Sequence, residues 1–162
     1  MIKSCIFSTF LLFACSNIVQ GFSTTARTAL VIDNTTGEVL LSKSIDRPIP
    51  PASMSKLMTL FMVFESLEEG KIEMNDTFRV SRKAWKKGGS KMFLREGENV
   101  TIENLIKGVI IQSGNDACIV LAEGLAGTEE NFAELMTIRA KEIGLTNSNF
   151  KNSTGWPDPG HY

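Results

Sequence analysis

A strongly apolar segment at residues 53–67 constrains the fold of this 162-residue chain more than any other stretch. Pro50 and Pro51 stand just before it and disfavour helical backbone there, so the sequence predicts a helix that begins at Ser53. Apolar side chains occur nearly all round this helix instead of along one stripe. That pattern is typical of a central, buried helix, so the rest of the chain has to supply elements that cover it.

The rest of the sequence predicts one β-hairpin followed by helices. The β-rich residues 28–33 and 38–42 flank Asn34-Thr35-Thr36-Gly37, which is typical of a hairpin turn. The other predicted elements are a strand at 76–80, helices at 105–111 (with Thr101 as its cap), 117–125 and 129–143, and a polar loop at 147–162. This order indicates an α+β fold. One two-stranded hairpin is too little sheet to cover the central helix.

Length and charge exclude some classes of function. A chain of 162 residues suits one modest domain with a core. Its formal net charge of -1 argues against nucleic-acid binding, which usually needs a strong basic excess. The basic cluster at 82–87 is therefore interpreted as a solvated surface segment.

The N-terminus predicts a secretory signal over residues 1–21. A positive charge precedes an apolar run at 6–14 that is too short for a membrane span. Val19-Gln20-Gly21 offers small residues for cleavage, so the mature domain is expected at 22–162. Two other readings are a lipidation site at Leu12-Phe13-Ala14-Cys15 and a buried N-terminal helix or strand.

Cysteine and histidine usage narrows the chemistry further. Cys5 and Cys15 fall in the predicted signal, which leaves Cys118 without a disulfide partner. Cys118 lies in an apolar run and is interpreted as a small core residue rather than a reactive thiol. A Cys–His nucleophilic pair is poorly supported, because the only histidine is His161, at the very end. No His, Cys and Asp cluster has the spacing of metal ligands.

Ser53 and Lys56 open the apolar helix as a Ser-x-x-Lys sequence. Residues three apart on a helix share a face, so the Ser53 hydroxyl and the Lys56 amine are expected to point the same way. A serine becomes a good nucleophile when a nearby base takes its proton. Lysine can be that base if burial or neighbouring cations lower its pKa. A second Ser-x-x-Lys sequence, from Ser148 to Lys151, lies in a polar stretch that offers no such burial.

Ser113-Gly114-Asn115 is a second candidate cluster, between two predicted helices. A hydroxyl at Ser113 could relay a proton from a lysine to a leaving amine, and the amide of Asn115 could hold the lysine and a substrate carbonyl. An ordinary interhelical turn is the alternative, because Ser, Gly and Asn are common turn residues.

Together, the two clusters resemble the first two of three motifs in penicillin-binding serine enzymes. Other segments resemble low-molecular-mass D-alanyl-D-alanine carboxypeptidases of serine peptidase family S11, in order, from Thr28 to Tyr162. These segments are 29–33, 51–59, 89–94, 113–118 and 154–158. The resemblance implies part of a β-lactamase/transpeptidase-like fold, with an N-terminal β-hairpin and a helical subdomain.

The same resemblance implies serine acyl transfer on peptidoglycan stem peptides. Ser53 would be the acyl-ester nucleophile, with its backbone N–H as one oxyanion donor, and Lys56 would be the general base. Ser113 would relay the proton to the departing D-alanine, and Asn115 would position Lys56 and bind the substrate. β-Lactams would acylate Ser53 as inhibitors, and no metal or organic cofactor is implied. The protein is expected to cross the inner membrane into the bacterial periplasm or cell envelope.

One motif of the family is absent. The third motif of the family, Lys-Thr-Gly, does not occur in residues 1–162. In the family, this motif lines the site opposite the serine helix and binds the substrate carboxylate. It sits on the strand that gives the second oxyanion donor. The sequence is therefore interpreted as the N-terminal part of a carboxypeptidase catalytic domain, in a truncated or partial form. It would lack the later sheet strands and a C-terminal membrane-associating region. Little activity is expected from it alone, since one lost oxyanion donor costs about a hundred- to a thousand-fold in turnover.

Two alternatives stay open. The first is a non-catalytic remnant or envelope-binding fragment, which the absent motif favours. The second is a β-lactamase, because Glu142-Ile143-Gly144-Leu145-Thr146 comes near the Glu-x-x-Leu-Asn sequence of class A enzymes. Thr146 stands where Asn is expected, however, and Glu142 also fits the exposed face of a helix.

Overall fold

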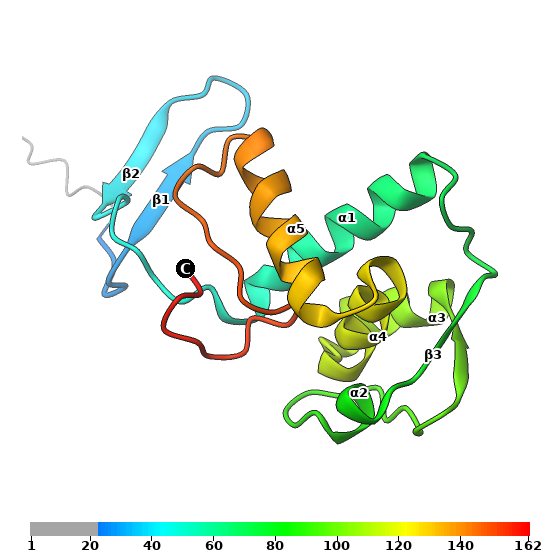
Figure 1. Cartoon of the computed structure of the whole chain (residues 1–162). Coiled ribbons are helices and arrows are strands. Elements are labelled where there is room, and N and C mark those ends of the chain that lie inside the picture. The colour runs from blue at the N-terminus through cyan, green and yellow to red at the C-terminus, as the bar shows by residue number, and fades with distance from the viewer. Residues whose placement is uncertain (1–22) are drawn as a thin grey trace, which may run out of the picture. The chain divides into compact units, whose positions relative to one another are not determined.

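The computed structural model describes residues 23–162, and the chain divides into two compact units between Arg47 and Pro48. The predicted signal at 1–21, with its two cysteines and the alternative lipidation site, lies outside the described residues. Figure 1 shows the elements coloured in chain order. They are β1 (Ala29–Ile32), β2 (Val39–Lys43), the 3₁₀ turn η1 (Ala52–Ser55), α1 (Lys56–Glu68), β3 (Thr77–Arg79), α2 (Arg82–Lys86), β4 (Asn99–Thr101), α3 (Ile102–Gln112), α4 (Asn115–Ala126) and α5 (Glu129–Glu142).

The first unit contains the predicted hairpin, in which β1 and β2 pair antiparallel. The Asp33 carboxylate holds the turn by accepting the backbone N–H groups of Thr36 and Thr35, each at 2.8 Å. These hydrogen bonds favour the charged carboxylate and so lower the pKa of Asp33. The hairpin prediction is confirmed.

The second unit is built around α4, where residues 115–122 are all buried. Helices α1, α2, α3 and α5 and strand β3 pack against it, and Figure 1 labels these elements. Cys118 lies fully buried on this helix, and burial raises the pKa of its thiol to about 12. The interpretation of Cys118 as a core residue is therefore confirmed.

The helix predicted from Ser53 is confirmed, but its burial is not. Its first turn is η1, and the α-helix proper begins at Lys56. Met58 and Val63 are buried, whereas Leu57 is 72% exposed. Helices α3, α4 and α5 pack against α1, and the described sheet of this unit is only the short β3–β4 pair. The prediction of a helix buried all round is thus wrong for the described residues.

The other predicted elements form with small shifts in their boundaries. The strand predicted at 76–80 is β3, and it pairs antiparallel with β4, which the sequence pattern did not indicate. Thr101 caps α3 as predicted, by accepting the N–H of Asn104 at 3.3 Å. Helix α4 begins at Asn115, earlier than predicted, and α5 agrees with the predicted helix at 129–143. None of the helices described for residues 23–162 has the length and hydrophobicity of a membrane span.

Asp116 ties the start of α4 to the segment that leads to β4. It is 1% exposed, and its carboxylate accepts the backbone N–H of Met92 at 3.0 Å and of Leu94 at 3.1 Å. Phe93, between them, has a φ of 63°, a left-handed backbone that costs a non-glycine residue about 1–2 kcal/mol. Asp116 therefore holds a strained turn against the N-terminus of α4.

We expect Asp116→Asn to lower the free energy of unfolding by about 1–2 kcal/mol. The amide keeps one acceptor oxygen but turns an NH₂ group toward one of the two N–H donors, and it lacks the charge that strengthens both hydrogen bonds. Urea denaturation followed by circular dichroism measures the change. Glu134→Gln, on the exposed face of α5, is the control, and equal stability of the two variants would contradict this role.

Candidate active site

Ser53 and Lys56 lie side by side where η1 passes into α1. The Lys56 Nζ atom is 3.2 Å from the Ser53 Oγ atom, so the predicted shared face is confirmed. Ser53 is exposed, whereas Lys56 is only 5% exposed. The pair therefore presents a solvent-accessible hydroxyl on top of a buried amine.

The environment of Lys56 favours the neutral amine. Burial strips water from the ammonium form and lowers the pKa of Lys56. No carboxylate within residues 23–162 forms an ion pair with it to oppose this effect. A neutral amine within hydrogen-bond reach of a hydroxyl can accept its proton, so the geometry and the electrostatics both suit a general base.

The backbone around this pair and around the second motif is strained. Four described non-glycine residues have a positive φ. Three of them lie in segments that resemble the family (51–59, 89–94 and 113–118): Ala52, Phe93 and Ser113, with φ of 49°, 63° and 53°. Such conformations cost about 1–3 kcal/mol each and are concentrated at functional sites. The strain is therefore a second indication, independent of side-chain chemistry, that these three segments form a site.

Ser113-Gly114-Asn115 forms the junction of α3 and α4. Ser113 ends α3, and Asn115, which is 6% exposed, begins α4. The backbone N–H of Asn115 donates to the Ser90 carbonyl, and its Nδ2 atom donates to the Gly88 carbonyl, both at 2.8 Å. The segment Gly88-Gly89-Ser90 is thus bonded at both ends to Asn115.

The structure does not join the two motifs by a hydrogen bond. Among the described residues, neither Ser113 nor Asn115 bonds to the side chain of Ser53 or Lys56. The second partner of Lys56 is instead the backbone carbonyl of Thr154, which accepts from Nζ at 3.0 Å. The relay role of Ser113 and the positioning role of Asn115 therefore stay predictions.

The residues around Thr154 are the part of the site that motif chemistry did not indicate. The Thr59 hydroxyl donates to the Ser153 carbonyl at 2.7 Å. The buried Glu129 carboxylate accepts from the Ser153 hydroxyl at 2.8 Å and from its N–H at 3.1 Å. Lys83 pairs with the other Glu129 oxygen at 2.8 Å. This network fixes the segment that carries the Thr154 carbonyl.

Gly155, within the segment 154–158 that resembles the family, is the residue whose backbone could have revealed this contact. Its φ is +76°, and a Cβ atom at this position would overlap the carbonyl of Ala52. A side chain is therefore excluded where the segment crosses the turn that carries Ser53. A glycine after a Ser-Thr pair in an otherwise polar loop is consistent with such a close approach.

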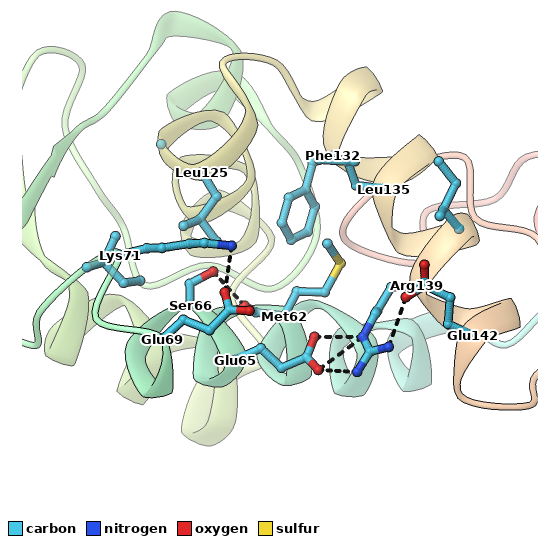
Figure 2. Close-up of a pocket in the computed structure, with 13 residues that line it drawn as sticks. Met62, Glu65, Ser66, Glu69, Lys71, Leu125, Phe132, Leu135, Arg139 and Glu142 are labelled. Carbon is cyan, nitrogen blue, oxygen red and sulfur yellow. Dashed lines mark hydrogen bonds and ion pairs between the residues drawn. The ribbon is translucent and has the colours of Figure 1, made fainter.

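A cleft of about 690 Å³ between α1, α4 and α5 is separate from this pair. Figure 2 shows that it lies beside the C-terminal half of α1, where Arg139 binds Glu65 at 2.6 Å and Glu142 at 2.9 Å. Because its charged groups bind one another, it offers no reactive constellation. Glu142, the residue that the β-lactamase alternative needs, is thus an exposed partner of Arg139. No group of three or more His, Cys, Asp or Glu residues within 23–162 could hold a metal ion.

Comparison of the sequence with protein families and known proteins identifies relatives of this chain. Residues 16–162 match the family model described as D-alanyl-D-alanine carboxypeptidase, peptidase S11. The chain is 45% identical over 137 residues to the D-alanyl-D-alanine carboxypeptidase DacF of Bacillus subtilis. This alignment covers 85% of this chain and 35% of the relative. The chain is also 41% identical over 156 residues to the D-alanyl-D-alanine carboxypeptidase DacC of Escherichia coli. That alignment covers 93% of this chain and 39% of the relative. The chain thus spans somewhat more than a third of the length of these relatives.

Solved structures agree with the sequence comparison. The crystal structure of the D-alanyl-D-alanine carboxypeptidase DacD from Francisella tularensis superposes with a TM-score of 0.83 at 35% identity, over 88% of this chain and 34% of that one. Penicillin binding protein 5 from Haemophilus influenzae gives a TM-score of 0.83 at 37% identity, over 89% of this chain and 43% of that one. The predicted fold class is confirmed, and the described residues represent only part of the fold.

Proposed function

Because the chain belongs to the D-alanyl-D-alanine carboxypeptidase family, peptidase S11, we propose that it carries the nucleophile and base of a serine-type D-Ala-D-Ala carboxypeptidase. Its substrate would be the stem peptide of peptidoglycan, from which the terminal D-alanine is removed. The observation that carries the proposal is the 3.2 Å approach of the buried Lys56 amine to the exposed Ser53 hydroxyl. The chain spans only part of its relatives, so the proposal concerns the activity of the full-length protein.

The proposed reaction has two balanced steps. Lys56 takes the hydroxyl proton while the Ser53 oxygen attacks the carbonyl carbon of the penultimate D-alanine. The C–N bond then breaks, and the departing D-alanine amine receives the proton through Ser113, which leaves an ester on Ser53. Lys56 then takes a proton from a water molecule that attacks the ester carbon. The acyl C–O bond to Ser53 breaks, the Ser53 oxygen regains the proton from Lys56, and the shortened peptide leaves. Asn115 would bind the substrate amide beside this pair.

The proposal extends to inhibitors and to location. β-Lactams would acylate Ser53 as substrate mimics, which is consistent with the name of the penicillin-binding relative. The apolar run at 6–14 supports export by a signal at 1–21, and peptidoglycan chemistry would then take place in the periplasm or cell envelope. A C-terminal region of the full-length protein would associate with the membrane.

A fluorescent penicillin tests the proposal directly. We expect it to form a covalent adduct that survives denaturation, and peptide mass spectrometry to place the adduct on Ser53. The second Ser-x-x-Lys sequence is an internal control, because no hydrogen bond joins Ser148 to Lys151 among the described contacts. An adduct on Ser148, or one that excess unlabelled penicillin does not prevent, would contradict the assignment.

The same experiment should be repeated on a longer form. Fusing the chain to the residues that follow the matched region in the Bacillus subtilis relative would add the region in which the family resemblance places the Lys-Thr-Gly motif and the strands around it. Labelling of the fusion alone would mean that the described residues need the rest of the domain. Absence of labelling in both forms would reject the proposed function.

A further inference from the structure

The polar segment 149–162 is a closed loop rather than a free tail. Its two ends pair through the backbone, since Asn149 N–H donates to the Tyr162 carbonyl at 2.7 Å and Tyr162 N–H donates back at 3.0 Å. The Asn149 side chain also donates to the Gly160 carbonyl. A loop whose ends meet in this way is an Ω-loop, and we call residues 149 and 160–162 its neck.

Through His161, the neck docks on the turn at residues 52–56 that carries Ser53, which we call the serine turn. The His161 Nε2 atom is 2.8 Å from the Ser55 Oγ atom. His161 is 4% exposed and Ser55 is 2% exposed, so water does not compete for this hydrogen bond. Ser55 lies between Ser53 and Lys56 in the sequence, so the contact is made to the turn that carries both residues.

The hydrogen-bond network assigns the tautomer of His161. The backbone N–H of Lys151 donates to Nδ1 at 3.3 Å, so Nδ1 carries the lone pair and Nε2 carries the proton. The imidazole therefore donates to the Ser55 hydroxyl. Burial lowers the pKa of His161, with Asp158 opposing this effect, and the neutral ring is the favoured form. The ring also contacts Phe150 edge to face, with 5.5 Å between centroids.

The tip of the same loop supplies the partner of the base. The Thr154 carbonyl accepts from the Lys56 Nζ atom at 3.0 Å, and Gly155 lies against the carbonyl of Ala52. The loop therefore touches the serine turn twice, through its neck at Ser55 and through its tip at Lys56. Because the loop is closed, the position of the neck constrains the position of the tip.

We infer that His161 is a positioning residue, which docks loop 149–162 on Ser55 and thereby holds the Thr154 carbonyl over Lys56 and keeps water from the amine. His161 touches neither the hydroxyl that reacts nor the amine, and acts only through the loop. The effect of His161 on catalysis rests on the proposed function. The docking of the loop on Ser55 does not depend on that function.

The test reads the state of Lys56 without any turnover. NMR titration of the lysine side chains in the 162-residue chain gives the pKa of Lys56, with the resonance assigned by its loss in Lys56→Arg. We expect His161→Phe, which keeps an aromatic ring but loses the donor, to raise the Lys56 midpoint by about one unit or more, toward that of an exposed lysine. Ser55→Ala removes the acceptor and should move the midpoint in the same direction.

Two further variants separate docking from general destabilisation. His161→Gln can still donate an amide N–H to Ser55 and should restore most of the wild-type midpoint. Tyr162→Ala alters an exposed side chain next to His161 and leaves the backbone pairing intact, so its midpoint should not move. An unchanged midpoint in a folded His161→Phe variant, or in Ser55→Ala, overturns the inference. Penicillin labelling plays no part, so failure here is distinct from failure of the proposed function.

Discussion

Lys56→Met is expected to slow acylation of Ser53 by a fluorescent penicillin by about a hundred- to ten-thousand-fold, the range that a general base contributes. Methionine keeps the apolar contacts of a side chain that is 5% exposed, but it cannot accept the Ser53 proton. The measurement is the observed rate of labelling, in the chain or in the fusion if only the fusion reacts. Lys151→Met in the second Ser-x-x-Lys sequence is the matched control and should label at the wild-type rate.

The pH dependence of labelling provides a second check on the same role. Only the unprotonated amine can take a proton, so the wild-type rate should rise with pH through the pKa of Lys56 and then become constant. Burial lowers that pKa, so the rise should come at lower pH than for an exposed lysine. The rise should vanish in Lys56→Met. A rate that keeps the same pH profile in both proteins would show that another group is the base.

Gly155→Ala is expected to lower the free energy of unfolding by roughly 2–5 kcal/mol. Two costs add at this position. The φ of +76° disfavours any residue with a side chain, and the new Cβ atom would overlap the Ala52 carbonyl, so backbone has to move. Because Thr154 is the adjacent residue, the movement should also take its carbonyl away from Lys56. Urea denaturation measures the stability, and the rate of penicillin labelling should fall with it.

Gly70→Ala separates the two costs. Gly70 has a φ of +67°, but a Cβ atom added there would meet no other atom within 4 Å, so alanine should cost only about 1 kcal/mol. The difference between the variants is the penalty for the close approach of Gly155 to Ala52. Similar stability of the two variants would mean that the loop does not press on the serine turn.

Local chemistry accounts for the parts of the fold that sequence predicted well. Turn residues at 34–37 predict the hairpin, and Pro50 and Pro51 set the start of the serine helix. The spacing of Ser53 and Lys56 alone brings a hydroxyl to an amine, because the geometry of one helical turn does not depend on the rest of the chain.

Contacts between distant segments account for what sequence missed. Lys56 meets Thr154 and Ser55 meets His161 across 98 and 106 residues, and no local pattern encodes such pairs. Strand β4 has only three residues, too few for an alternating pattern to stand out. The error about α1 has a related cause, since apolar periodicity describes the helix itself and not the elements that cover it.

The long sequence separation between Lys56 and its hydrogen-bond partner Thr154 has a consequence for folding. A contact between residues so far apart pays its loop-closure entropy late, after the local helices and the hairpin can form. Until loop 149–162 closes, the loop does not shield Lys56 from water, so the burial that lowers the pKa of Lys56 is incomplete. Ser53 would therefore stay unreactive in any folding intermediate in which this loop has not closed, and its reactivity could begin only after the contact between Lys56 and Thr154 has formed.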